Sequence, residues 1–247
     1  RLCAISAAMT DGTGLSEFFK KFPERSFDVG IAEGHAVTFS AGLSAGGCVP
    51  VFAVYSSFFQ RSFDNSLHDA ALQNLHCVFG IDRAGLSPDD GSTHHGIFDV
   101  SMFSLMSNCT VFAPLTYKSL ESALDISVNA KNGIWAIRYP KGSEFTEGLK
   151  LSEEFVYTDE NYNENSDVMI VTYGRIYTEA LLAKKILAEK GVGCSVVVLE
   201  KILPVSASFE KVKKYCSKAC KIIILEEGME SGGFGQNILS MINADSE

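Results

Sequence analysis

Polar, aromatic and basic side chains that could do chemistry gather in four short stretches, each directly after an apolar run of the chain. In chain order these stretches are GIAEGHAVT, YSSFFQR, DRAGLSPDDGSTHHG and RYPKG. Ligands of open parallel sheets bind beyond the carboxyl ends of the strands. If the apolar runs form such a sheet, the four stretches meet at one rim and build a single site.

Glu33 is the acid of the first stretch and stands at the start of a helix-like segment. The positive end of a helix favours a carboxylate at that position. Two interpretations stay open. Glu33 either caps its own helix, or it is a half-buried acid that shares a proton with a nitrogen heterocycle.

The third stretch places two adjacent aspartates and two adjacent histidines within seven positions: Asp89, Asp90, His94 and His95. Carboxylates and imidazoles this close together suit a divalent metal ion or general acid–base catalysis. The glycines among them permit tight turns that would present these groups to a pocket. A solvated surface loop fits the same composition, and both interpretations stay open.

Arg83 and Arg138 follow or lie within apolar runs, where an arginine is rarely buried without a partner. The guanidinium fork suits a phosphate or a carboxylate, and an internal ion pair with one of the acids is the alternative. Tyr55 and Phe58 are either core residues or a flat surface on which a ring stacks. The sequence has no P-loop and no strand–turn–helix GxGxxG motif, so it does not support nucleotide binding through those devices.

Short apolar runs alternate with helix-like patterns along the chain, and this rhythm predicts the elements that position the four stretches. The runs are continuous, as in strands that are covered on both faces. The rhythm predicts an α/β fold with a mostly parallel sheet. Strands are expected at 2–6, 26–31, 49–55, 77–82, 110–114, 134–139, 168–172, 194–199 and 222–225, and helices at 32–45, 57–74, 98–106, 118–130, 176–190 and 209–219.

The rhythm lapses in the acidic, Asn-rich segment 143–166, which predicts a surface linker with one short strand at 155–157. The linker separates a first domain, 1–142, from a smaller α/β domain, 167–247. The second domain ends soon after a new helix begins, and its three expected strands would leave an exposed edge. We therefore expect that domain to be truncated.

Charge and composition disfavour several classes of partner. Lys and Arg number 21 against 30 Asp and Glu, a net charge of −9 that disfavours nucleic-acid binding. No apolar run approaches the roughly 20 residues that span a bilayer, and no signal or transit peptide is visible. The seven cysteines fit reduced, buried thiols, and no second His or Cys pair completes a thiolate metal site. These features predict a cytoplasmic protein with neither nucleic-acid nor membrane partners.

Several longer segments of the first domain, between Ala7 and Gly142, resemble the 1-deoxy-D-xylulose-5-phosphate synthase family of thiamine diphosphate enzymes in the transketolase superfamily. They are AAMTDGTGL, FPERSFDVGIAEGHAVTFSAGL, VPVFAVYSSFFQRSFDNSLHDAALQNL, FGIDRAGLSPDDGSTHHGIFDVS and IRYPKG. The second domain matches more loosely, through VTYG, LPV and EEGMESGGFGQ. The text IDRAGL followed by DGSTHHG is specific to this synthase. The resemblance implies a transketolase-type pyrimidine-binding domain at 1–142 and a transketolase C-terminal-like domain at 167–247.

The resemblance implies a cofactor role for the first two stretches. Glu33 corresponds to the catalytic glutamate that hydrogen-bonds the N1′ nitrogen of the thiamine aminopyrimidine and promotes formation of the carbanion nucleophile. Phe58 would stack on the pyrimidine ring. Asp90 and His94 would line the reacting centre as catalytic residues. Arg61 lies in the same matching text without an assigned role.

The remaining matches imply a substrate site. Tyr55, Arg83 and Arg138 would bind the phosphate of D-glyceraldehyde 3-phosphate, since a dianion needs fixed positive charge. The implied reaction is decarboxylation of pyruvate and transfer of the two-carbon unit to this aldehyde, in isoprenoid and thiamine precursor synthesis. Two departures could alter local geometry, because Gly34 stands where the family has Gln and Lys141 where it has Arg.

The family's ligands for the cofactor diphosphate and Mg²⁺ lie on a GDG…N motif that this sequence lacks. We therefore expect these ligands on a missing N-terminal domain or a separate subunit, a homodimeric assembly, and no turnover by the chain alone. Two alternatives stay open. The chain could be another transketolase-like or 2-oxoacid-decarboxylating subunit, or a non-catalytic module that only dimerises.

Overall fold

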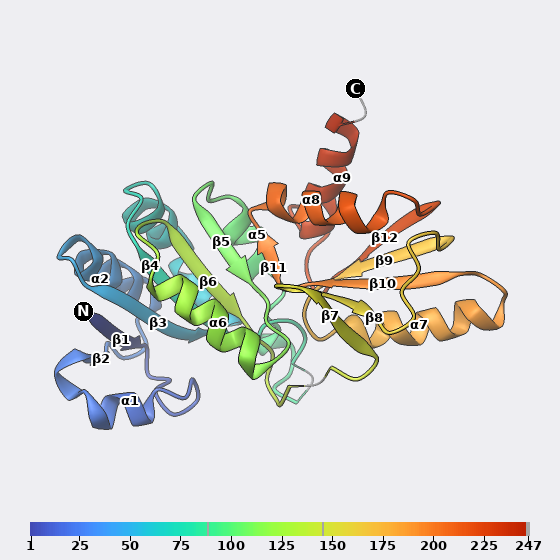
Figure 1. Ribbon diagram of the computed structural model, residues 1–247. Helices are drawn as coiled ribbons and strands as arrows, with labels where there is room; N and C mark the ends of the chain where they lie inside the picture. Colours follow the sequence, from blue (N-terminus) through green and yellow to red (C-terminus); the bar gives the residue numbers. More distant parts are fainter. Residues whose placement is uncertain (88, 145, 246–247) are drawn as a thin grey trace.

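Two β-sheets, each with helices on both faces, lie end to end in the computed structural model (Figure 1). The structure describes residues 1–87, 89–144 and 146–245. The predicted α/β class is confirmed, and parallel pairs dominate the first sheet. None of the described helices is long and apolar enough to cross a bilayer.

The first sheet has seven strands in the order β11-β5-β6-β4-β3-β1-β2. All neighbours pair in parallel except β11, which runs antiparallel to β5. Central strands such as β4 are buried on both faces, which explains their unbroken apolar runs. The strands are β1 (Leu2–Ser6), β2 (Ser26–Asp28), β3 (Val49–Tyr55), β4 (Cys77–Asp82), β5 (Cys109–Phe112), β6 (Ile134–Arg138) and β11 (Lys201–Leu203).

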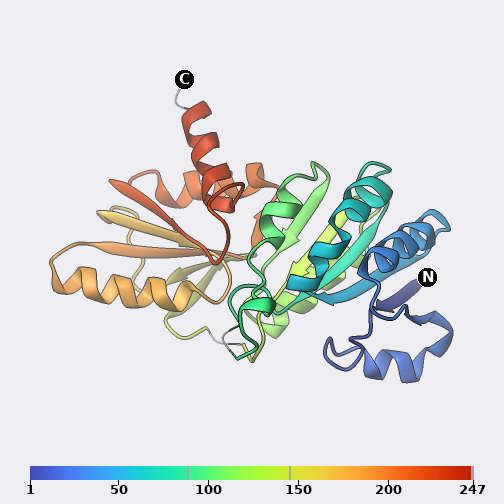
Figure 2. The same ribbon diagram turned by 180° about the vertical axis from the view of Figure 1, so that it is seen from behind.

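Helix α6 (Tyr117–Val128) covers one face of this sheet in Figure 1, and the helices between residues 33 and 104 cover the other face in Figure 2. A capping box between Thr116 and Ser119 begins α6. The single helix predicted at 57–74 is instead a succession of short α, 3-10 and π turns. The other helices are α1 (Ser16–Lys21), α2 (Glu33–Ala45), α3 (Ser56–Phe59), α4 (Phe63–Asn65) and α5 (Asp99–Ser104), with shorter turns at η1 (Pro23–Arg25), η2 (Gln60–Ser62), η3 (Ser66–Ala71) and η4 (Ser92–His94).

The second sheet has five strands in the order β12-β9-β10-β8-β7. Strand β9 pairs in parallel with β10 and β12, whereas β8 is antiparallel to both β10 and β7. Helix α7 lies on one face, and α8 and α9 lie on the other (Figure 1). The bounds are β7 (Leu149–Glu153), β8 (Val156–Asp159), β9 (Val168–Thr172), β10 (Cys194–Leu199) and β12 (Lys221–Leu225), and α7 (Tyr177–Glu189), α8 (Val205–Cys216) and α9 (Phe234–Asp245).

The segment 143–166, predicted as a linker, contributes the hairpin of β7 and β8 to the second sheet, so that prediction needs correction. The short strand predicted at 155–157 overlaps β8, whereas β7, whose residues are mostly exposed, was not predicted. Asp159 is 2% exposed and pairs with Lys184, and its Oδ2 accepts a hydrogen bond from the Val196 amide at 2.7 Å. These partners come from distant parts of the chain, and no local pattern reveals them.

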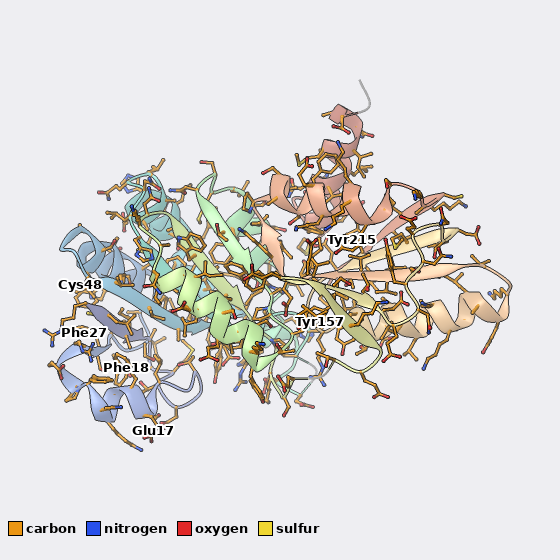
Figure 3. All side chains as sticks on the ribbon, viewed as in Figure 1. Glu17, Phe18, Phe27, Cys48, Tyr157 and Tyr215 are labelled. Carbon is orange, nitrogen blue, oxygen red and sulfur yellow. The ribbon has the colours of Figure 1, made fainter. Side chains whose placement is uncertain are left out.

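Glu200 joins the two sheets, since β10 ends before it and β11 begins after it. Its carbonyl accepts a hydrogen bond from the Ala113 amide, and its carboxylate Oε1 accepts from the Leu115 amide and Ser119 Oγ, all at 2.6 Å. Figure 3 shows Tyr157 at the same junction, between α6 and the second sheet. The buried apolar cluster is continuous through this junction, so the two sheets share one core.

Candidate active site

Five of the predicted site residues form one connected cluster beyond the carboxyl ends of β3 and β4. The Tyr55 and Phe58 rings stack with centroids 5.8 Å apart, and His94 meets the Phe58 ring at 5.2 Å. The Arg83 guanidinium lies 4.0 Å from the centre of the Tyr55 ring and donates to Tyr55 Oη at 2.9 Å. It also donates to Asp90 Oδ2 at 2.6 Å. The cluster thus joins a flat aromatic surface to a charged end.

Glu33 is linked to this cluster through Arg61. Glu33 is the first residue of α2, and its side chain is 4% exposed. Its Oε1 accepts a hydrogen bond from Arg61 Nη1 at 2.8 Å, and the Arg61 guanidinium lies 5.2 Å from the centre of the Phe58 ring. Within the described part of the chain, Glu33 Oε2 has no hydrogen-bond donor. A buried carboxylate therefore keeps one oxygen available, and Arg61 links that carboxylate to the aromatic surface.

The glycine at position 34 has a local explanation. A Cβ built on Gly34 would lie 2.7 Å from Asn65 Oδ1, which is too close for an unshifted contact. Asn65 in turn donates to Thr38 Oγ1 at 3.0 Å. The space that a side chain at position 34 would need is therefore already occupied, and Glu33 keeps its place in the first turn of α2.

The loop after β4 is closed at its base, and this closure presents Asp90 and His94 to the cluster. The amides and carbonyls of Gly85 and Gly96 exchange hydrogen bonds at 2.9 and 2.8 Å. A Cβ on Gly96 would lie 2.5 Å from the Ser56 side chain, so only glycine fits without movement. His95 does not join the cluster, because its Nδ1 accepts a hydrogen bond from the Ser87 amide at 3.1 Å and holds the loop.

Lys141 is a site residue that the sequence pattern did not assign. Its Nζ lies 3.1 Å from Asp90 Oδ1 and 3.4 Å from Oδ2, so Asp90 contacts two cations, Lys141 and Arg83. These contacts, the Lys141 hydrogen bond above all, hold the pKa of Asp90 below its ordinary value. The departure from arginine at this position was the only signal in the sequence.

Arg138 lies apart from the cluster, in an internal ion pair. Its Nε donates to Asp99 Oδ2 at 2.9 Å, and the two side chains are 4% and 1% exposed. The guanidinium also lies 5.1 Å from the centre of the Tyr173 ring. Of the two interpretations that the sequence left open, the structure has the internal pair, and it brings Arg138 into no direct contact with Arg83 or Tyr55.

A cavity of about 890 Å³ opens beside the charged end of the cluster, between the two sheets. Glu227 borders it and packs against Gly85, and the Leu86 backbone hydrogen-bonds its carboxylate. Burial raises the pKa of Glu227. No sequence pattern indicates this residue, because its contact with the loop depends on how the two sheets meet. The polar lining includes Asp90, His95, Lys141, Arg175, Glu179 and Glu227.

Two residues of the site fit the aminopyrimidine end of thiamine diphosphate. Glu33 with its available oxygen and the half-buried Phe58 ring fit an aminopyrimidine, which offers a ring nitrogen and a flat face. In residues 1–87, 89–144 and 146–245, no group of three or more His, Cys, Asp or Glu side chains could hold a metal ion.

Comparison with known families identifies both parts of the chain. The domain described as transketolase, pyrimidine binding domain, matches residues 1–144, and that described as transketolase, C-terminal domain, matches residues 160–246. The chain belongs to the transketolase family. The pyrimidine-binding match contains Glu33, the aromatic cluster and every strand of the first sheet except β11.

Curated relatives confirm the resemblance noted in the sequence. A 1-deoxy-D-xylulose-5-phosphate synthase from Clostridium botulinum (strain Alaska E43 / Type E3) is 45% identical over 242 residues, which are 97% of this chain and 38% of that protein. A 1-deoxy-D-xylulose-5-phosphate synthase 1 from Geobacter sulfurreducens is 43% identical over 246 residues, 98% of this chain and 38% of that protein. The chain therefore spans less than two fifths of these relatives' length.

Solved structures share the fold at low identity. A protein described as split gene transketolase, inactive beta4 tetramer, has a TM-score of 0.73 and 22% identity, and the match covers all of this chain and 80% of that one. A transketolase mutant from Pichia stipitis has a TM-score of 0.76 and 17% identity, with 97% and 40% of the two chains covered. The two-sheet architecture is thus that of transketolases.

Proposed function

We propose that this chain is the pyrimidine-binding and C-terminal part of a 1-deoxy-D-xylulose-5-phosphate synthase. The enzyme would decarboxylate pyruvate and transfer the two-carbon unit to D-glyceraldehyde 3-phosphate, with thiamine diphosphate and Mg²⁺ as cofactors. The observation that carries the proposal is the buried Glu33 carboxylate, which keeps one oxygen available and is linked through Arg61 to the Phe58 ring. The names of relatives that match nearly the whole chain support the same reaction.

In this proposal Glu33 holds a proton at the ring nitrogen of a bound aminopyrimidine. Its position in the first turn of α2 and its 4% exposure keep water from competing for that proton. Phe58 supplies the stacking face, and Arg61 fixes the carboxylate. When bound, thiamine diphosphate supplies the nucleophilic carbon on which the two-carbon unit is carried.

Arg83 and Tyr55 are proposed to bind the phosphate of the aldehyde. Tyr55 holds the Arg83 guanidinium through a ring contact and a hydrogen bond to its Oη, so little side-chain freedom is lost when Arg83 binds an oxyanion. His94 and Asp90 flank the space between this charged end and the Phe58 ring, where the reacting centre would lie. Arg138 is proposed to bind the phosphate as well, with its guanidinium held by the ion pair with Asp99.

The ligands for the diphosphate and Mg²⁺ would come from a further domain or a second polypeptide, and the assembled enzyme would be a cytoplasmic homodimer. The length of the relatives supports a further domain or polypeptide, since more than half of each relative lies outside the match. The neighbour described as an inactive beta4 tetramer of a split gene transketolase is consistent with a chain that associates with itself and is inactive alone.

A reconstitution experiment tests the proposal. The chain is mixed with the N-terminal part of a curated relative, thiamine diphosphate, Mg²⁺, pyruvate and D-glyceraldehyde 3-phosphate, and product is measured against the chain alone. We expect product only in the mixture, and a loss of about 100-fold or more with Glu33→Gln. The matched control is Glu17→Gln, a side chain 86% exposed on α1. Activity of the Glu33→Gln mixture close to that of wild type would exclude the assigned role.

The same mixture separates the proposal from its alternatives. If Arg83 binds a phosphate, unphosphorylated glyceraldehyde should compete poorly with D-glyceraldehyde 3-phosphate as acceptor. Another two-carbon transferase would accept the unphosphorylated aldehyde. A non-catalytic module would give no product and would not retain the cofactor in the presence of the N-terminal part.

A further inference from the structure

Asp90 occupies the place between two cations at the edge of the interdomain cavity. Its carboxylate contacts Arg83 Nη1 at 2.6 Å and Lys141 Nζ at 3.1 Å, and its side chain is 19% exposed. Arg83 also donates to Tyr55 Oη. The two cations that could bind an oxyanion here are therefore already bound to an oxyanion that belongs to the chain itself.

The charges at this place are unequal. Arg83 and Lys141 carry two positive charges, and Asp90 supplies one negative charge. A phosphate monoester carries about 1.5 to 2 negative charges near pH 7 and three acceptor oxygens. A phosphate can therefore neutralise both cations, which Asp90 alone does not.

A monocarboxylate has no such advantage. It brings the same charge and the same two oxygens as Asp90, and it must also lose translational freedom that the tethered side chain has already lost. Pyruvate, the other substrate in the proposed reaction, is a monocarboxylate. An internal carboxylate at this place would thus separate the two substrates by charge.

We propose that Asp90 is an internal counter-ion that fills the acceptor-phosphate site of Arg83 and Lys141, so that a phosphate dianion displaces it and a monocarboxylate does not. This inference rests on the proposed function, which assigns the acceptor phosphate to Arg83. It adds Lys141 as a further phosphate-binding residue and gives Asp90 a selective role before any chemistry. The displaced carboxylate has water available, because the cavity that it borders is open and about 890 Å³ in volume.

The test measures equilibrium binding of inorganic phosphate and of acetate to the full chain by titration calorimetry. In wild type we expect phosphate to bind and acetate not to bind detectably. Asp90→Asn should bind phosphate roughly three- to tenfold more tightly and should gain acetate binding. Lys141→Gln added to Asp90→Asn should remove both gains. Circular dichroism and thermal unfolding confirm that each variant is folded.

The matched control is Asp89→Asn, which makes the same change of charge on the same loop and beside the same cavity. We expect less than about a twofold change in phosphate affinity, because within the described residues Asp89 has no ion pair. An equal gain in phosphate affinity in Asp89→Asn and Asp90→Asn would mean that only the net charge of the loop matters, and would overturn the inference.

Arg83→Gln distinguishes failure of the inference from failure of the proposed function. If wild type and Asp90→Asn bind phosphate equally, and Arg83→Gln abolishes binding in both, the counter-ion role is overturned while the acceptor site stands. If phosphate binds to none of the proteins, or binds without regard to Arg83, the phosphate site in the proposed function is wrong as well.

Discussion

The Arg61 guanidinium donates to the Glu33 carboxylate at 2.8 Å, although Arg61 is 58% exposed and Glu33 only 4%. A solvated cation thus balances a buried anion from the outside. Because Arg61 is the only described side chain that hydrogen-bonds Glu33, its removal leaves the carboxylate buried without a partner.

Arg61→Met is expected to lower the free energy of unfolding by about 1 to 2 kcal/mol, since it keeps most of the side-chain volume and removes the partner of a buried charge. Urea unfolding of the full chain measures this. Lys20→Met is the control, because Lys20 and Glu17 form an exposed pair and its loss should cost less than about 0.5 kcal/mol. Equal effects of the two substitutions would contradict the importance of burial at Glu33.

The buried pair of Arg138 and Asp99 predicts a non-additive result. Either Arg138→Met or Asp99→Leu alone should destabilise the chain by about 3 kcal/mol or more, because each leaves one buried charge uncompensated. The double variant should be more stable than either single variant, since neither charge of the pair is then left buried without its partner. Strictly additive losses in urea unfolding would show that the two residues do not act as a pair.

Glu200 predicts a pH dependence of stability. Burial raises the pKa of its carboxyl from the ordinary value of 4.5, so the folded chain holds this proton to higher pH than the unfolded chain does. The native state binds more protons in that window, and its stability therefore falls as pH rises through it. Glu200→Gln removes this loss.

Thermal unfolding of wild type and Glu200→Gln at about pH 5 and about pH 8 measures the effect. The variant should gain in Tm over wild type at the higher pH and show a smaller difference at the lower one. The control Glu121→Gln, on the exposed face of α6, should show no pH-dependent difference. A Glu200→Gln variant that follows wild type at both pH values would contradict the prediction.

Substitution of two glycines by alanine is expected to change the free energy of unfolding in opposite directions, because their surroundings differ. Gly96→Ala places a Cβ 2.5 Å from the Ser56 side chain and 2.7 Å from the Arg83 carbonyl oxygen, so it should cost about 2 kcal/mol. Gly42→Ala, in α2, has no atom within 4 Å of the new Cβ and should stabilise the chain by about 1 kcal/mol. Chemical unfolding of both variants checks the opposite signs. Destabilisation by both would mean that packing at Gly96 is not the cause.

The sequence predicted those parts of the fold that local chemistry determines. Strands β1, β3 and β4 have the predicted bounds, because their apolar runs are unbroken and end at polar residues. Tyr55, Phe58 and Arg83 come together at one rim, as the rule for the carboxyl ends of parallel strands predicts. Periodicity and strand polarity were sufficient for these features.

Features that depend on distant partners were not predictable in the same way. The role of Arg138 depends on whether an acid reaches it, and that acid, Asp99, comes 39 positions earlier in the chain. Strand β8 buries Thr158 and Asp159, two polar residues that are typical of a linker. Asp159 is buried because Lys184 and the Val196 amide pair with it, and both lie far away in the sequence. Helix α1 and the three-residue β11 are too short for any period to stand out.

The continuous path from β10 through Glu200 into β11 makes the two halves of the molecule mechanically interdependent. A fragment that stops at residue 142 would lose β11, which covers the free edge of β5, and a fragment that starts at 167 would carry β11 with no sheet to join. A chimaera that combines halves of two relatives should therefore take residues 200–203 and strand β5 from the same relative, even where the domain boundary falls between them.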